Sequence, residues 1–241
     1  TGLPDVPLRR LAFSPNYATD HTTYATSEDR LYRSLDGGQR WTEVGAPPGS
    51  PALSALAVDS SGHVYVASSL GVWRYTTPAQ DIIVNGGFEA NSGWAMPVTP
   101  RQAGYSDRVA YDGRQSVRVG IDNGSIKYAY SSARQVVTIP ADATKATLSF
   151  YVYRVSSRPV YGDAQYVLIM DPNTNAILRA VFWNVSNAQQ WQHTTFDLMP
   201  YAGQTIVVHF GVRNDGAKGR TGMYVDDVSL VVTRPARPTS R

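Results

Sequence analysis

The chain has 241 residues, a net charge of +3 and no cysteine, which excludes disulfides, thiolate metal sites and cysteine nucleophiles. Three arginines, Arg234, Arg237 and Arg241, lie in the last eight positions, so the rest of the chain is close to neutral and offers no broad basic surface for nucleic acid. No apolar run approaches the roughly 18 residues of a membrane span.

The composition favours strands over helices. Tyr, Val, Thr and Gly are frequent, whereas Lys and Glu are scarce. The length exceeds that of most single small domains and fits two β domains in one chain. We therefore expect an all-β protein with almost no helix.

The first part of the chain contains two copies of one pattern. Residues 24–33 align with residues 65–74 at an offset of 41 positions without a gap, and this period is typical of a propeller blade. Predicted strands cover residues 8–14, 22–27, 31–34, 40–44, 53–59, 63–68 and 72–76. The second copy thus ends after three strands, and its open edge could pair with residues 1–7 or with another chain.

Between the third and fourth strands of the first copy lies the segment SLDGGQRW, at positions 34–41. This segment resembles the Asp-box, or BNR, repeat of sialidases and sortilin-type propellers. The resemblance implies a structural turn in which the aspartate accepts backbone N–H bonds, the glycines adopt positive φ angles and the tryptophan packs beneath. The residues of this turn are Ser34, Asp36, Gly37, Gly38 and Trp41.

Two blades are fewer than the four to eight that close a propeller. We therefore expect an incomplete propeller over residues 1–78, whose blades need further cover. A second copy of the chain could provide it, by strand pairing or by blade stacking.

A different pattern begins near residue 79 and runs to residue 233. It contains NGGFE at 85–89, SGW at 92–94, DGRQSVRV at 112–119 and YVDDVSL at 224–230, in that order. These motifs resemble the jelly-roll carbohydrate-binding modules of families four and nine. The alternation of Leu148, Phe150 and Val152 with polar or aromatic residues agrees with a two-sheet sandwich. Residues 234–241 are predicted to form an extended Arg/Pro tail.

The same resemblance implies a structural calcium ion. Its ligands would be Glu89 and Asp226, with Asp227 and the turn that ends at Ser116, since oxygen ligands suit this hard cation. The alternative is that these carboxylates are ordinary hydrogen-bond acceptors in tight turns.

Aromatic side chains are the candidates for glycan binding, because an exposed ring offers a platform for a sugar. We expect five of them to share one concave face, with the amides of Gln165, Asn184, Gln189 and Gln190 nearby. The alternative for each ring is packing, since large aromatic residues are mostly buried. The five are Tyr151, Tyr153, Tyr166, Trp183 and Trp191.

No catalytic constellation is evident in the sequence. The four histidines are scattered without metal-ligand spacing, and no pair of carboxylates suggests glycoside hydrolysis. We expect a secreted, non-catalytic structural or adhesive protein at the cell surface that associates with copies of itself. The alternative is a polysaccharide-binding part of a larger secreted hydrolase or sialidase-like protein.

Overall fold

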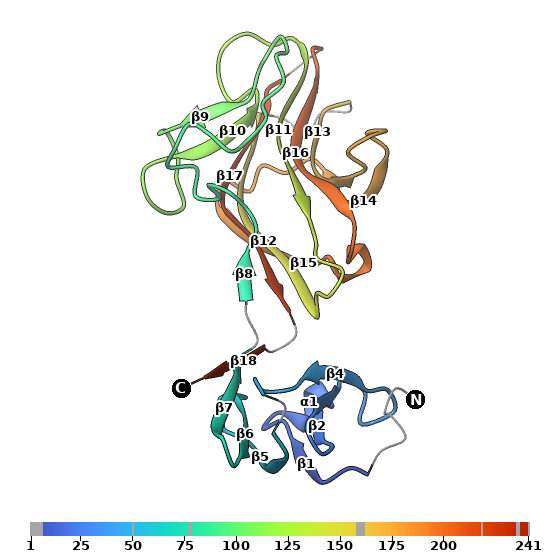
Figure 1. Ribbon diagram of the computed structural model, residues 1–241. Coiled ribbons are helices and arrows are strands. Elements are labelled where there is room, and N and C mark those ends of the chain that lie inside the picture. Colours follow the sequence, from blue (N-terminus) through green and yellow to red (C-terminus); the bar gives the residue numbers. More distant parts are fainter. Residues whose placement is uncertain are drawn as a thin grey trace. The chain divides into compact units, whose positions relative to one another are not determined.

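A computed structural model describes residues 7–49, 51–76, 79–157, 162–217, 219–234 and 237–240. Over these ranges the chain is all-β, apart from the helical turn α1 (Tyr17–Asp20) and the 3-10 turn η1 (Met199–Tyr201). The chain divides into two compact units (Figure 1), one formed by residues 1–78 with 234–241 and the other by residues 79–233. No helix in the described ranges is long and apolar enough to cross a membrane.

The first unit contains two four-stranded antiparallel sheets. The first sheet has the order β1-β2-β3-β4, with β1 (Arg10–Phe13), β2 (Thr23–Thr26), β3 (Leu31–Ser34) and β4 (Thr42–Gly45). The second sheet contains β5 (Leu53–Val58), β6 (Val64–Ser68) and β7 (Gly71–Thr76). The helical turn α1 lies in the loop between β1 and β2. The buried core shared by the two sheets consists of Leu31, Leu53, Val64, Val66, Trp73 and Tyr75.

The fourth strand of the second sheet comes from the end of the same chain. Strand β18 (Arg237–Ser240) pairs antiparallel with β7, and Figure 1 shows the dark red β18 beside the green β7. The prediction of an open outer edge was therefore wrong, and part of the predicted extended tail supplies the strand that closes this edge. Sequence patterns within residues 1–78 could not reveal a partner that lies more than 150 positions further along. Residues 1–6, the expected partner, lie outside the described ranges.

The turn at residues 34–41 is braced by its own side chains. The Asp36 carboxylate accepts a hydrogen bond from the Arg40 backbone N–H at 2.8 Å and one from the Ser34 hydroxyl at 2.8 Å. The Trp41 indole N–H donates to the Gly38 carbonyl at 2.8 Å, and Gly38 has a φ of +97°. These contacts hold the loop between β3 and β4 without a ligand.

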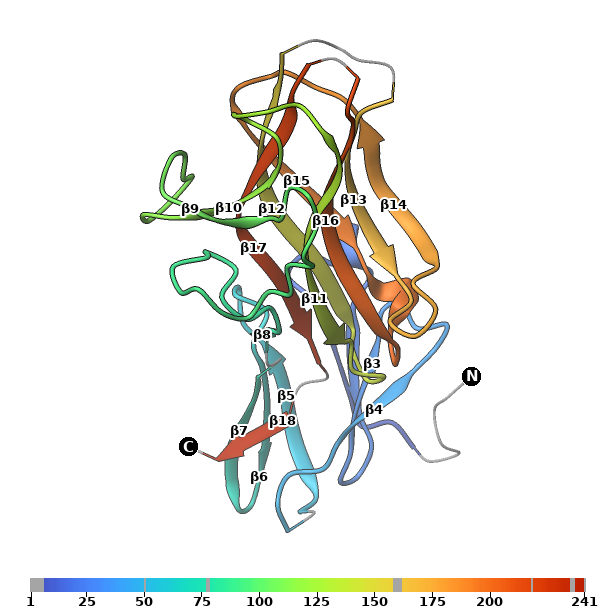
Figure 2. The ribbon, with the colours of Figure 1, turned by 90° about the horizontal axis from the view of Figure 1, so that it is seen from above.

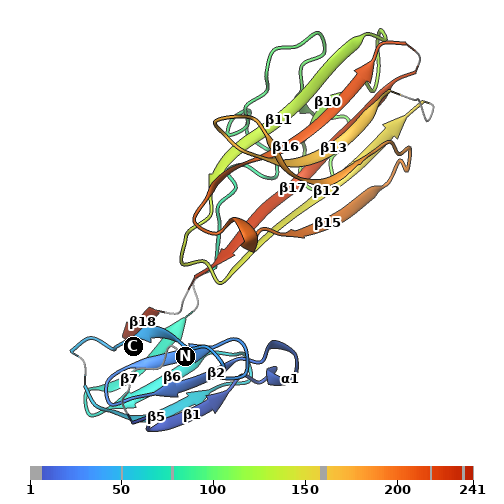
Figure 3. The same cartoon turned by 90° about the vertical axis from the view of Figure 1, so that its right-hand side faces the viewer.

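The second unit is a sandwich of two antiparallel sheets, which Figure 3 shows from the side. The larger sheet has the order β15-β12-β17-β10-β9, with β8 on β17, and the smaller sheet has the order β11-β16-β13-β14. Figure 2 shows both sheets from above. The strands are β8 (Ala79–Asp81), β9 (Gly104–Ser106), β10 (Ser116–Gly120), β11 (Tyr128–Thr138), β12 (Lys145–Ser156), β13 (Ala164–Met170), β14 (Ile177–Asn184), β15 (Trp191–Asp197), β16 (Thr205–Asp215) and β17 (Thr221–Thr233).

The two sheets bury alternate side chains between them. Leu148, Phe150 and Val152 of β12 are buried, as the alternation predicted, and the Phe150 ring meets the Phe210 ring of β16 at 5.2 Å. Trp94 also joins this core, with its ring 5.8 Å from Phe210. Burial of one face of each sheet leaves the opposite side chains on two outer faces.

Truncation at the C-terminus tests the pairing of β18. A chain that ends at Thr233 leaves the β7 edge with unpaired N–H and C=O groups, so we expect a lower melting temperature and concentration-dependent association. Differential scanning calorimetry and light scattering across a dilution series measure both effects. A chain that ends at Ser240 is the control. Identical behaviour of the two truncated chains would contradict the role of β18.

Candidate functional site

The outer face of the β11-β16-β13-β14 sheet carries three rings in one row. The rings of Trp183 on β14 and Tyr166 on β13 are stacked at 4.7 Å and 20°, and the His209 ring on β16 lies 5.8 Å from Tyr166 at 14°. We call these three residues the platform. The side chain of Trp183 is 49% exposed, whereas Tyr166 is 5% exposed. The indole of Trp183 is therefore the ring that a ligand could reach.

The close stacking depends on Gly211. Tyr166 and Gly211 face each other in register on β13 and β16, and a Cβ at position 211 would collide with the Tyr166 ring. The absent side chain thus lets the tyrosine ring lie against the sheet. Burial raises the pKa of the Tyr166 hydroxyl to about 12, so this ring stays neutral at ordinary pH.

His209 lies next to a positive charge. Arg134 of β11 is its partner in register, and burial together with the Arg134 charge lowers the pKa of His209 to about 4. The imidazole is therefore neutral near pH 7 and can hydrogen-bond without carrying charge. Its Nδ1 atom is buried and has no hydrogen-bond partner among the described residues.

Further polar and aromatic groups flank the platform. Tyr130, which is 46% exposed, pairs in register with Arg213, and Arg213 pairs in register with Ala164 on its other side. Neither Arg134 nor Arg213 forms an ion pair within the part of the chain that the structure describes. This face thus combines an exposed indole with guanidinium groups that have no carboxylate partner among the described residues.

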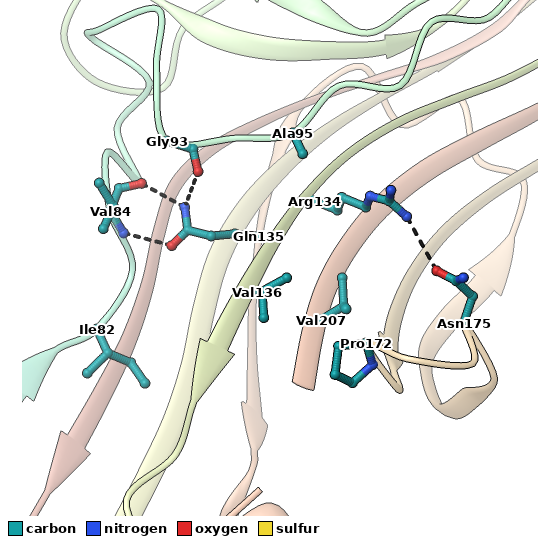
Figure 4. A pocket seen from close by; sticks show the side chains of 10 residues that line it. All are labelled: Ile82, Val84, Gly93, Ala95, Arg134, Gln135, Val136, Pro172, Asn175 and Val207. Carbon is teal, nitrogen blue, oxygen red and sulfur yellow. Dashed lines mark hydrogen bonds between the residues drawn. The ribbon is translucent and has the colours of Figure 1, made fainter. Parts of the chain in front are cut away.

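A pocket of about 610 Å³ opens at one end of this face (Figure 4). The Gln135 amide holds one wall, since it bonds the Val84 N–H and the carbonyls of Val84 and Gly93, each at 2.9 Å. On the other side the Arg134 guanidinium donates to the Asn175 side-chain oxygen at 3.4 Å. The volume falls within the usual range for ligand sites. The pocket is lined by Ile82, Val84, Gly93, Ala95, Arg134, Gln135, Val136, Pro172, Asn175 and Val207.

The other predicted rings lie on the other sheet. Tyr151 and Tyr153 of β12 and Trp191 of β15 face outward from the larger sheet, where Tyr153 and Trp191 are partners in register. Since the outer faces of a sandwich point in opposite directions, the prediction of one shared concavity was wrong. Alternation along β12 and β13 shows which side chains face outward but not which sheet each strand joins.

In this second cluster the rings cover one another. Tyr111, from the loop before β10, stacks on Tyr151 at 3.6 Å and 15°, and the His193 ring lies 4.5 Å from Tyr151. Tyr111 was missed from the sequence, because a loop residue has no periodicity to place it. Tyr111 is 43% exposed, whereas Trp183 is 49% exposed and has the larger ring.

The carboxylates expected to bind calcium hold the loop that carries Tyr111. Glu89 Oε1 accepts the backbone N–H groups of Arg114 at 2.7 Å and Gln115 at 2.9 Å. Asp226 Oδ2 accepts the Tyr111 N–H at 2.7 Å, and burial raises the pKa of Asp226 to about 6. Both carboxylates therefore bind the backbone of residues 111–115.

A bulge in β17 explains the position of Asp226. Opposite Ser149 and Tyr151 of β12, the partners on β17 are Ser229 and Asp226, so one extra residue is accommodated at this point. Asp227 in the bulge is exposed, with a φ of +49°. The Ser116 hydroxyl donates to the Val109 carbonyl at the other end of the same loop. No three His, Cys, Asp or Glu side chains are grouped to hold a metal within the described ranges.

The expected amide ligands have other roles. Gln165 is fully buried and its side-chain amide donates to three backbone carbonyls, including that of Gly222 at 2.8 Å, so it is part of the core. Asn184 accepts a hydrogen bond from Arg154 at 2.7 Å. Gln189 lines a second pocket of about 340 Å³ beside Tyr153 and Tyr224. None of these three lies on the platform.

No protein-family model matches the chain. Among curated proteins, a segment of 108 residues is 31% identical to the pre-pro-metalloprotease PrtV of Vibrio cholerae serotype O1, and it covers 40% of this chain and 11% of that protein. The chain thus corresponds to a small fraction of that relative's length.

Several of the similar solved structures are carbohydrate-binding modules. One, TmCBM61 in complex with β-1,4-galactotriose, is 16% identical and covers 63% of this chain and 97% of that chain, with a TM-score of 0.46. A second, the family 16 carbohydrate-binding module 2, is 16% identical and covers 62% and 98%, with a TM-score of 0.42. A Stig cyclase from Fischerella sp. TAU is 19% identical and covers 66% and 100%, with a TM-score of 0.42. Such distant likenesses do not assign a function.

The depressed pKa of His209 predicts a pH-dependent stability. Between pH 4 and 6.5 the unfolded chain binds more protons at His209 than the folded chain does. The stability that the neutral His209 gives the folded protein is therefore complete above pH 6.5 and is lost as the pH falls toward 4. Relative to His209→Gln, the wild-type protein should lose roughly 3 kcal/mol of unfolding free energy between pH 7 and pH 4. Urea unfolding of both proteins at the two pH values measures the difference. An unchanged difference would show that His209 titrates as in a peptide.

Proposed function

We propose that this protein binds a polysaccharide on the outer face of the β11-β16-β13-β14 sheet. The observation that carries the proposal is the 49% exposed Trp183 side chain, stacked on Tyr166 and followed in the same row by His209. The apolar C–H face of a sugar ring packs on such an indole, and neighbouring polar groups bond its hydroxyls. Tyr166 stacks between Trp183 and His209, so the sugar ring would pack on the part of the indole that Tyr166 leaves open.

Binding without catalysis is part of this proposal. On the neighbouring strands, Tyr166 pairs in register with Gly211, and His209 pairs with Arg134 and Leu168. Hydrolysis of a glycoside requires a pair of carboxylates across the bound sugar, and these neighbours provide guanidinium and aliphatic groups instead. We also propose an extracellular location, where polysaccharide ligands are available.

Self-association remains a weaker proposal, because its main support was an open edge on the second sheet. That edge is paired with β18 of the same chain. The resemblance of the first unit to Asp-box blades stays a proposal as well. The braced turn at Asp36 and the four-stranded order of both sheets support it.

We further propose that calcium stabilises the turn at residues 111–115. The oxygen atoms available there fit a hard cation: Asp226 is fully buried with a raised pKa, and the Gln115 side-chain oxygen is buried without a hydrogen-bond partner among the described residues. Glu89 uses only Oε1 for the two backbone N–H groups that it accepts. A bound cation would offset the cost of burying the Asp226 charge.

Paired tryptophan variants test the binding face. Trp183→Ala should abolish detectable binding to an immobilised polysaccharide panel, because it removes the exposed ring of the platform. Trp191→Ala, on the opposite sheet, should bind as the wild-type protein does. Affinity gel electrophoresis and calorimetry measure both.

The reverse pattern would move the site to the Tyr111–Tyr151 cluster. Binding that survives in both variants would contradict the proposed use of aromatic platforms. Far-ultraviolet circular dichroism of the two variants checks that each remains folded.

Calcium should raise the melting temperature of the wild-type protein relative to a chelator by roughly 5 °C or more at a hundredfold excess over the dissociation constant. Asp226→Asn removes the buried charge and should lose this shift. Asp227→Asn is the matched control, since Asn tolerates the positive φ at this exposed position. Scanning calorimetry measures the shifts, and an equal shift in all three proteins would contradict a calcium site at Asp226.

A further inference from the structure

The pocket beside the platform contains one charged lining residue, Arg134. Most of the other lining groups are aliphatic, and two of them, Val84 and Val136, are 61% and 59% exposed. Figure 4 shows the Arg134 guanidinium reaching toward Asn175 across the sheet. The pocket thus combines apolar walls with a single cationic group.

Arg134 is poorly satisfied within the protein. The hydrogen bond from its guanidinium to the Asn175 side-chain oxygen is 3.4 Å long, and the side chain is half-buried. A guanidinium normally makes shorter and stronger paired bonds to carboxylate or sulfate oxygens. An acidic ligand group would therefore gain more from Arg134 than Asn175 does.

Among the described residues, no acidic side chain lines the pocket. Asp171 belongs to the turn that carries Pro172 and Asn175, but its Oδ1 atom accepts hydrogen bonds from the Asn173 N–H at 2.9 Å and the Thr174 N–H at 2.8 Å. No ion pair joins Arg134 to any carboxylate in the described ranges. The described side chains that line the pocket therefore include one positive charge and no negative charge.

Arg134 links the pocket to the platform. Arg134 pairs in register with His209, and the His209 ring stacks on Tyr166, which in turn stacks on Trp183. A polysaccharide that packs one ring on Trp183 could thus extend along the same face toward Arg134. One ligand would then contact both sites.

We infer that the Arg134 pocket binds the acidic group, a carboxylate or a sulfate ester, of a sugar in the polysaccharide that packs on Trp183. The ligand class is then an anionic polysaccharide, and the inference rests on the proposed function. The guanidinium pairs with the acidic oxygens, while Val84 and Val136 contact the C–H groups of the same sugar.

Four polymers test the charge preference: polygalacturonate and its methyl ester, and dextran sulfate and dextran. At low ionic strength, where charges are least screened, the wild-type protein should bind one acidic polymer roughly tenfold more tightly than its neutral partner. The acidic polymer that binds identifies a carboxylate or a sulfate as the recognised group. Equal binding within both pairs, or no binding to either acidic polymer, would overturn the inference.

Arg134→Gln should lose the preference for the acidic polymer and keep the wild-type melting temperature. Arg40→Gln, at an exposed arginine of the other unit, makes the same change in net charge and should keep the preference. Arg134→Lys retains the charge without the planar fork and should show a weaker preference. An equal loss in the Arg134→Gln and Arg40→Gln variants would overturn the inference, because only net charge would then matter.

Trp183→Ala separates the two proposals. Loss of binding to acidic and neutral polymers alike supports the platform, and the Arg134→Gln result then decides the pocket alone. Unchanged acidic binding in Trp183→Ala, with loss in Arg134→Gln, overturns the platform and with it the inference of one ligand that contacts both sites.

Discussion

The functional face depends on the burial of alternate side chains between two sheets. On β16 the core takes Ile206, Val208, Phe210 and Val212, so His209, Gly211 and Arg213 must face outward. A slip of one residue in register would bury a guanidinium and an imidazole and expose four apolar side chains. The core therefore fixes which groups meet a ligand, although it makes no contact with one.

Two local features turn this outer face into a binding surface. The absence of a side chain at Gly211 allows the Tyr166 ring to stack between Trp183 and His209. The amide of Gln135 fixes residues 84 and 93 against β11 and so builds one wall of the adjacent pocket. One missing side chain and one buried amide thus shape both the platform and the pocket.

The buried acid of the larger sheet and the arginine of the smaller sheet differ in their hydrogen-bond partners. On the larger sheet, the bulge of β17 aims Asp226 at the backbone of residues 111–115, where N–H groups partly offset the burial of its charge. On the smaller sheet, Arg134 has only a long hydrogen bond to an amide. An acid held by backbone donors suits a structural role, whereas an arginine left without an acid suits a ligand.

Period-two alternation and turn residues are local properties, so the amino-acid pattern alone predicts the all-β class, the change of pattern near residue 79 and which side chains of β12 are buried. It also identified Trp183 and Tyr166 as candidates. The folded chain was needed to show that Tyr151 and Trp191 lie on the opposite sheet, that β18 closes the edge of β7, and that Arg134 lies beside His209. These facts follow from strand order and long-range pairing, and no local pattern encodes which distant strand becomes a neighbour.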